Sequence, residues 1–96
     1  MTTLEQIRAK RSEILAIAER NGVENLRIFG SVARGDDRPD SDIDFLGDVK
    51  RGHKLLGLYG CQVELEEYFG RKVDLLFPQS LHWSLKDSIL SEATPL

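Results

Sequence analysis

Apolar residues recur at the spacing of an α-helix over residues 3–21, with charged residues between them. This pattern predicts an amphipathic helix of about five turns whose apolar stripe covers one face of a sheet. Thr2 or Thr3 is suited to cap the start of this helix, because a threonine hydroxyl can accept a hydrogen bond from a free N–H group of the first turn. Glu5 or Gln6 would complete a capping box.

Three shorter apolar segments are bounded by turn residues, which is typical of strands. They are residues 26–29, 42–46 and 72–77. In the second segment, Asp42 and Asp44 alternate strictly with apolar residues. Because successive side chains of a strand point to opposite sides, we expect both aspartates on one face and Ile43 and Phe45 on the other.

Helical or turn-forming patterns fill the remaining segments. Residues 31–34 are suited to one or two helical turns directly after the first strand, residues 55–70 carry a second long amphipathic helix, and Ser80 can cap a last helix. Residues 35–40 are turn-forming, and residues 47–54 are polar and predict a loop. The expected order is helix, strand, short helix, strand, helix, strand, helix.

The size and composition of the chain predict one globular domain over residues 1–96, with 41% hydrophobic and 30% charged residues. No apolar run approaches the roughly eighteen residues that a membrane helix needs, and no signal-peptide pattern is present. We therefore expect a cytoplasmic protein without membrane contact. The formal net charge of -3 lacks the broad positive field that attracts nucleic acid, so direct nucleic-acid binding is not expected.

Gly30 and Ser31 stand where the first strand ends and the short helix begins. Free N–H groups and the helix dipole at such a position attract anions, and a glycine lets a phosphate approach the backbone closely. A Gly-Ser pair before a helix is also suited to an ordinary N-cap, so the pair by itself is a weak indication of a phosphate site.

Asp42 and Asp44 are expected about 6.6 Å apart along one strand, close enough for both carboxylates to approach one cation. Mg²⁺ prefers oxygen ligands and takes one or two carboxylates together with water and substrate phosphates. The alternative is a solvated strand face with turn-capping aspartates. That alternative must account for two like charges on one face and for a residue type that forms strands poorly.

Asp74 lies within the third apolar segment, where a carboxylate pointing into the core would be costly. If this strand lies beside residues 42–46, about 4.8 Å away, Asp74 joins Asp42 and Asp44 on the same face. Three carboxylates could then hold two cations, which stabilise the attacking and leaving oxygens of a phosphoryl-type displacement. The alternative is a surface aspartate on an edge strand.

The Gly-Ser pair, the interval that follows it and the Asp-x-Asp pair together resemble the nucleotidyltransferase superfamily that includes DNA polymerase beta and kanamycin nucleotidyltransferase. The longer strings GSVARGDDRPDSDIDFL, GRKVDLLFPQSL and ILSEATPL are similar to the minimal nucleotidyltransferases, the MntA-type antitoxin partners of HEPN-domain toxins. This similarity spans nearly the whole chain.

The resemblance implies an α/β (α+β) fold, a small mixed β-sheet with helices packed against it, as in the palm of polymerase beta. It implies a two-metal magnesium site at the catalytic residues Asp42, Asp44 and Asp74. Asp74 would also be a candidate to accept the proton of the incoming hydroxyl group. The phosphates of a nucleoside triphosphate, ATP, would rest on Gly30 and Ser31.

Arg34 matches the Ala-Arg-Gly of the minimal group, which suggests a contact with phosphate or carboxylate; a surface salt bridge is an equal alternative. The resemblance implies that AMP is transferred from ATP to a tyrosine hydroxyl of the HEPN toxin, which would form a hetero-oligomer with this chain. The alternatives are a catalytically silent antitoxin that acts by binding alone and a small-molecule nucleotidyltransferase subunit.

Five residues outside these motifs carry separate expectations. Gly47-Asp48 stands where related chains tend to continue with apolar residues, so it either shortens the second strand or adds a fourth acidic group near the site. His53 and His82 lack the spacing of metal ligands and are expected at the surface. Trp83 lies off the apolar stripe of the last helix, which suggests an exposed side chain and an interface.

Overall fold

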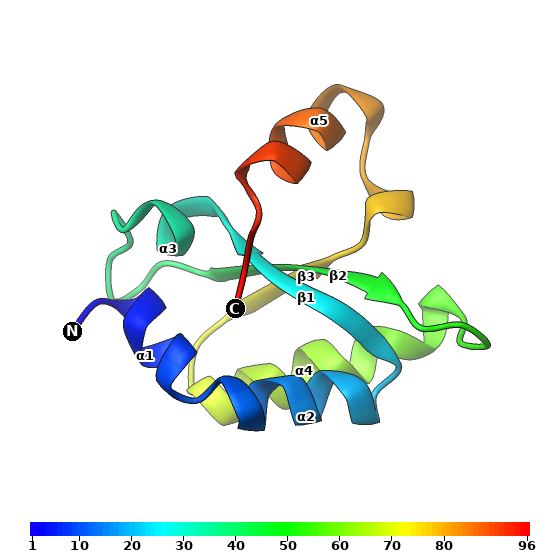
Figure 1. The fold of residues 1–96 in the computed structure, drawn as a ribbon, viewed down its shortest axis with the longest axis horizontal. Coiled ribbons are helices and arrows are strands. Elements are labelled where there is room, and N and C mark those ends of the chain that lie inside the picture. Colours follow the sequence, from blue (N-terminus) through cyan, green and yellow to red (C-terminus); the bar gives the residue numbers. More distant parts are fainter.

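The computed structural model describes all 96 residues except for the side chain of Leu56. Four strands form one sheet in the order β3-β2-β1-β4 (Figure 1). β1 (Val23–Phe29) pairs antiparallel with both β2 (Ile43–Val49) and β4 (Thr94–Pro95). β2 pairs in parallel with β3 (Val73–Leu76), so the mixed sheet that the family resemblance implied is confirmed.

Helices lie on both sides of this sheet (Figure 1). One side is covered by α2 (Arg11–Arg20) and α4 (Tyr59–Phe69), while α3 (Gly30–Arg34) and α5 (Trp83–Glu92) stand on the other. α1 (Thr3–Ala9) precedes α2 and contacts α3. Two short 3-10 turns precede α4 and α5, at Leu55–Leu58 and Pro78–Ser80.

The hydrophobic core lies between the sheet and the layer of α2 and α4. Ile43 and Phe45 of β2 point into this core and are 1% and 0% exposed. Because side chains alternate along a strand, Asp42 and Asp44 face the opposite side, where α3 and α5 stand. The expected placement of Ile43 and Phe45 on the face opposite Asp44 is therefore confirmed, while Leu46 is also buried although it lies on the face of Asp44.

The first helix is interrupted, so the single helix predicted over residues 3–21 is wrong. The predicted capping box is present at Thr2 and Glu5, but α1 ends at Ala9 and Lys10 adopts a non-helical backbone conformation before α2 begins. The break lets α1 contact α3 while α2 packs on β1 and α4. Tertiary contacts thus override a local pattern that continues through residue 10.

β2 extends through Val49, so Gly47 does not shorten the strand and the loop predicted over residues 47–54 begins later. A Cβ atom on Gly47 would lie 2.5 Å from Cγ1 of Val23 on β1. The glycine therefore makes room for a side chain of the neighbouring strand, a contact that local turn preference does not reveal.

Asp48 does not supply the fourth acidic group near the aspartates. Its Oδ1 forms an ion pair with Nη2 of Arg27 at 2.7 Å, and its Oδ2 accepts a hydrogen bond from Asn25 Nδ2 at 2.9 Å. These contacts lie four residues along β2 from Asp44, roughly 13 Å at the rise of a strand.

The last helix begins at Trp83, because His82 and not Ser80 is its N-cap. Nδ1 of His82 accepts a hydrogen bond from the Ser84 N–H group at 3.2 Å. No residue of α5 is buried, and Trp83 is 80% exposed, as predicted. Figure 1 shows this helix projecting from the body of the molecule.

The C-terminal residues return to the sheet as β4, a strand that the sequence did not predict. Ile28 and Arg27 of β1 are its partners in the sheet. Arg8 donates a hydrogen bond to the carbonyl oxygen of Pro95 at 3.0 Å, and Arg11 donates one to that of Leu96 at 3.1 Å. The end of the chain is therefore fixed against β1, α1 and α2.

The outer edge of β3 is closed by two side chains of α4. Oε2 of Glu66 accepts a hydrogen bond from the Val73 N–H group at 3.0 Å, and Oε1 of Gln62 accepts one from Leu75 N–H at 3.2 Å. The opposite edge is the two-residue strand β4, which contains Pro95.

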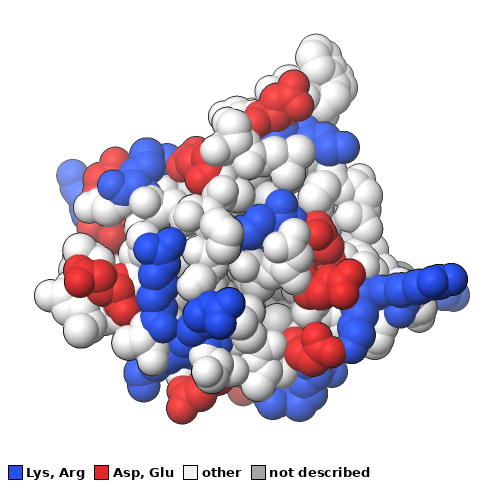
Figure 2. Space-filling model, in the orientation of Figure 1, with Lys and Arg blue, Asp and Glu red and all other residues white. Residues whose placement is uncertain are grey.

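The surface mixes charges of both signs, and Figure 2 shows acidic and basic side chains interspersed over one face. His53 and His82 are exposed, as expected. Within the described part of the chain, no helix is both long and apolar enough to cross a bilayer.

Candidate active site

The two parallel strands bring two of the predicted aspartates side by side. Asp44 of β2 and Asp74 of β3 are direct partners in the register of the sheet, and adjacent strands lie about 4.8 Å apart. Asp42 lies one residue before β2 and two before Asp44. The structure thus gathers all three aspartates at one end of the β2–β3 pair, on the side of the sheet that carries α3 and α5.

Asp44 is half-buried between these groups, and its pKa is raised to about 6. Burial is the largest cause, followed by the negative charges of Asp74 and Asp42. Glu92 raises the pKa further, and the positive charge of Arg34 partly opposes the shift. The charges of Asp74 and Asp42 therefore lie close enough to Asp44 to disfavour its charged form.

Gly30 follows the last residue of β1 and lies directly against Asp44. A Cβ atom on Gly30 would be 2.2 Å from Oδ2 of Asp44, and the φ angle of Gly30 is +75°. A residue with a side chain would displace the carboxylate and also strain the backbone. The sequence predicted glycine here for the approach of a phosphate, whereas the structure shows that Asp44 itself requires it.

Gly30 and Ser31 form the first turn of α3, as expected, but a carboxylate already contacts this turn. Oε1 of Glu92, the last residue of α5, accepts a hydrogen bond from the Gly30 N–H group at 2.9 Å. The same oxygen forms an ion pair with Nη1 of Arg34 at 2.7 Å. Arg34 also contacts Asp36 at 3.3 Å, so its guanidinium group joins two carboxylates.

Glu92 is the site residue that the sequence analysis missed. It stands in the string ILSEATPL, which contributed to the family resemblance without a role for any single residue. One signal could have drawn attention to it, because a negative charge in the last turn of a helix opposes the helix dipole. Such a residue suggests a partner outside its own helix, and here that partner is α3.

The three aspartates supply hard oxygen donors that suit Mg²⁺. Among the described residues, no group of three or more His, Cys, Asp or Glu side chains is arranged to hold a metal ion. Magnesium needs only one or two protein carboxylates and completes its shell with water and phosphate oxygens. A cation would also relieve the repulsion that raises the pKa of Asp44. The donors therefore fit a site that water and nucleotide phosphates would complete.

Comparison with known proteins finds a matching family model and similar chains. Residues 11–96 match the family model described as a nucleotidyltransferase domain. The protein adenylyltransferase MntA of Thermococcus cleftensis is 35% identical over 96 residues, which span 96% of this chain and 94% of that protein. A solved structure described as a candidate minimal nucleotidyltransferase is 40% identical with a TM-score of 0.83, and the match covers 97% of this chain and 95% of that chain.

A more distant solved structure shares the fold. It contains a tri-AMPylated HEPN toxin from Shewanella oneidensis in complex with an MNT antitoxin. Its matching chain is 16% identical with a TM-score of 0.67, over 92% of this chain and 69% of that chain.

Proposed function

Because the chain belongs to the nucleotidyltransferase domain family, we propose that it transfers AMP from ATP to a tyrosine hydroxyl of a HEPN-domain toxin and thereby acts as an antitoxin. The observation that carries this proposal is the register of β2 and β3, which puts Asp44 beside Asp74. The name of the Thermococcus cleftensis relative supports AMP as the transferred group and a protein as the acceptor. The Shewanella oneidensis complex supports a HEPN toxin as the partner.

In this proposal Asp42, Asp44 and Asp74 hold magnesium. Two bound magnesium ions would neutralise the charge that develops on the attacking and leaving oxygens. Asp44 and Asp74 fix where that charge is neutralised, because β2 and β3 are hydrogen-bonded neighbours in one sheet.

The phosphates of ATP bind at the first turn of α3. Three groups supply the donors: the Gly30 N–H group, the Ser31 hydroxyl and the Arg34 guanidinium. Hydrogen bonds to an ionised phosphate are stronger than those between neutral groups. Glu92 now contacts two of these three donors, so its carboxylate gives way when the phosphates bind.

The transfer is a displacement at the α-phosphorus of ATP. The tyrosine oxygen of the partner forms a bond to this phosphorus, while the bond from the α-phosphorus to the oxygen bridging it to the β-phosphate breaks. Pyrophosphate leaves, and the tyrosine proton passes to the Asp74 carboxylate. The products are AMP-tyrosine on the partner and free pyrophosphate.

Intact-mass spectrometry after incubation with ATP, Mg²⁺ and a co-encoded HEPN partner tests this function. The partner is expected to gain the mass of one or more AMP units. Asp44→Asn and Asp74→Asn are expected to reduce the rate by at least about a thousandfold, because each removes a proposed metal ligand. Asp48→Asn is the matched control, since it removes a carboxylate from the same strand that pairs with Arg27 away from the site.

No mass gain with the parent chain, combined with equal protection from the toxin by the parent and Asp44→Asn, would overturn the enzymatic proposal. The protein would then be an antitoxin that acts by binding alone. A gain of AMP on small hydroxyl compounds but not on the partner would instead indicate a small-molecule nucleotidyltransferase.

A further inference from the structure

Asp42 differs from Asp44 and Asp74 in lying outside the strands. β2 begins at Ile43, so strand pairing does not hold the backbone of residue 42. The Asp42 carboxylate contacts the Lys72 ammonium at 3.9 Å, and the Lys72 side chain is 70% exposed. A long ion pair at the surface contributes little to fixing a side chain. The position of Asp42 therefore depends on how the loop before it is held.

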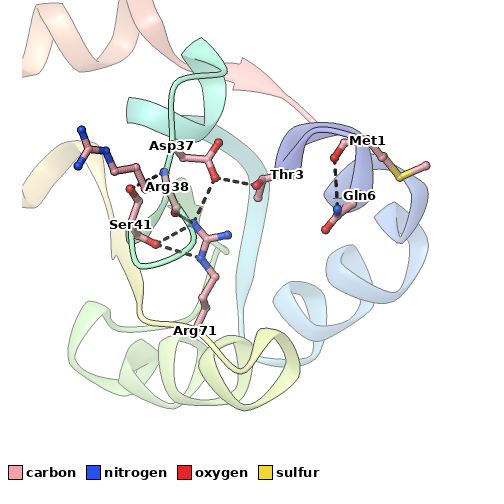
Figure 3. Close-up of polar contacts among 7 residues, drawn as sticks. All are labelled: Met1, Thr3, Gln6, Asp37, Arg38, Ser41 and Arg71. Atoms are coloured by element: carbon pink, nitrogen blue, oxygen red, sulfur yellow. Dashed lines mark hydrogen bonds and ion pairs between the residues drawn. The ribbon is translucent and has the colours of Figure 1, made fainter.

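Arg71 holds this loop through two backbone carbonyl oxygens (Figure 3). Its Nε and Nη2 atoms both donate hydrogen bonds to the Ser41 carbonyl oxygen, at 3.0 and 2.8 Å. Nη2 also donates to the Arg38 carbonyl oxygen at 3.0 Å. The Ser41 carbonyl belongs to the peptide bond that leads directly into Asp42, so the guanidinium group holds the chain one bond before this aspartate.

Asp37 holds the Arg71 guanidinium from the other side. Oδ2 of Asp37 lies 3.3 Å from Nη2 of Arg71 and accepts a hydrogen bond from the Thr3 hydroxyl at 2.6 Å (Figure 3). The side chains of Arg71 and Asp37 are only 20% and 9% exposed. The hydrogen bond from Thr3 and then the contact with Arg71 lower the pKa of Asp37, so this carboxylate stays charged and keeps the ion pair at neutral pH.

The backbone after Asp42 is anchored by the neighbour of Arg71. The Ile43 N–H group donates a hydrogen bond to the Lys72 carbonyl oxygen at 3.0 Å. Asp42 thus lies between two anchors, Arg71 before it and Lys72 after it. Both anchors come from the segment that leads into β3 and Asp74.

We propose that Arg71 is a positioning residue that fixes the Asp42 carboxylate relative to Asp74, so that both reach the same metal ions. This inference rests on the proposed nucleotidyl transfer. In this proposal Arg71 acts only through the position of Asp42, because its described contacts are with Ser41, Arg38 and Asp37. Its planar guanidinium group is suited to the role because it can bond two carbonyl oxygens and a carboxylate at once, whereas an ammonium group offers no such fork.

The test compares Arg71→Lys and Arg71→Gln with the parent chain. The first measurement is the affinity for Mn²⁺ with a non-hydrolysable ATP analogue and no partner, followed by electron paramagnetic resonance. The second is the rate of AMP transfer. Both variants are expected to weaken Mn²⁺ binding and lower kcat by about 10- to 100-fold, the usual effect of losing a group that orients a metal ligand. At saturating Mg²⁺, KM for ATP is expected to change less than about twofold, because the phosphate donors on α3 are unchanged.

Arg38→Gln is the matched control. It removes a guanidinium group from the same loop, and within the described contacts only the backbone of Arg38 is bonded to Arg71 and Ser41. Thermal unfolding identifies any variant that fails to fold, and Arg71→Lys keeps the positive charge that Asp37 needs. Arg71→Lys that folds and matches the parent in both Mn²⁺ affinity and kcat would overturn the positioning role.

The two measurements distinguish a failure of the proposed function from a failure of the proposed role of Arg71. A parent chain that binds Mn²⁺ but transfers no AMP would contradict the proposed function, and the Mn²⁺ affinities of the variants would still decide whether Arg71 positions Asp42. A parent chain that binds no Mn²⁺ would overturn both.

Discussion

Asp44 is the residue that is affected both by the charges of the site and by close packing against the backbone. Asp74 lies beside it on β3, and Gly30 lies against it after β1. The alternation of Asp42 and Asp44 was enough to predict two like charges on one face of this segment. The contact with Gly30 was not predictable, because it depends on the register of β1 against β2 and not on any local pattern.

If Asp44 holds magnesium as proposed, its raised pKa makes that binding depend on pH. Affinity for Mg²⁺ is expected to fall as the pH drops through about 6, because the protonated carboxyl is a poor ligand. Calorimetric titration between about pH 5 and pH 8 measures this dependence, with Asp48→Asn expected to follow the parent. An affinity that stays constant through this range would contradict the assignment of Asp44 as a ligand.

The same pKa predicts the sign of a stability effect without metal. The folded-state pKa of Asp44 is raised above its ordinary value of 3.8, so the stabilisation from the protonated form is fully present below about pH 4. It is lost as the pH rises through about 6. Asp44→Asn should therefore stabilise the metal-free protein more at pH 8 than at pH 4, as measured by urea unfolding.

Gly30 and Gly35 offer a matched pair, because both have φ near +80° but only Gly30 is crowded. Gly35→Ala has open space around it and is expected to cost about 1–2 kcal/mol of unfolding free energy for the left-handed backbone alone. Gly30→Ala is expected to cost more, because its Cβ atom would displace the Asp44 carboxylate. Equal losses for the two variants in urea unfolding would contradict the close contact.

At the scale of elements, the predictions succeeded where a period extends over several residues. The three longer strands and the helix now called α4 fall near their predicted positions. The errors arose where contacts distant in sequence decide the outcome, as at the break before Arg11 and the continuation of β2 through Gly47. β4 has two residues, too few for any period, and it forms because β1 offers it an edge.

α5 is joined to the site through one side chain at its end, Glu92. Glu92→Gln is expected to tighten ATP binding by several-fold to about tenfold, since the variant removes a negative charge that occupies the donors of α3. Asp36→Asn is the control, because Asp36 contacts Arg34 but not Gly30. Titration with a non-hydrolysable ATP analogue measures the affinities, and weaker binding by Glu92→Gln would show that Glu92 supports the phosphate donors instead of competing for them.

At the scale of the whole molecule, the sequence could predict the grouping of the residues that lie on one face of the sheet. Predicting that Asp42, Asp44 and Asp74 lie together needed only the assumption that their two strands are neighbours. Glu92 meets Gly30 across 62 positions of sequence, because β4 brings the end of the chain back to β1. No spacing rule connects two such residues, so this contact required the folded molecule.

The two α4 side chains that bond to the outer edge of β3 also affect whether another chain can add a strand to this sheet. Glu66 and Gln62 take the N–H groups of Val73 and Leu75, the ones that an added strand would need. The other edge is short and includes a proline, which has no N–H group to offer. Both edges of the sheet therefore disfavour the addition of a strand, whether that strand comes from another protein or from a second copy of this chain.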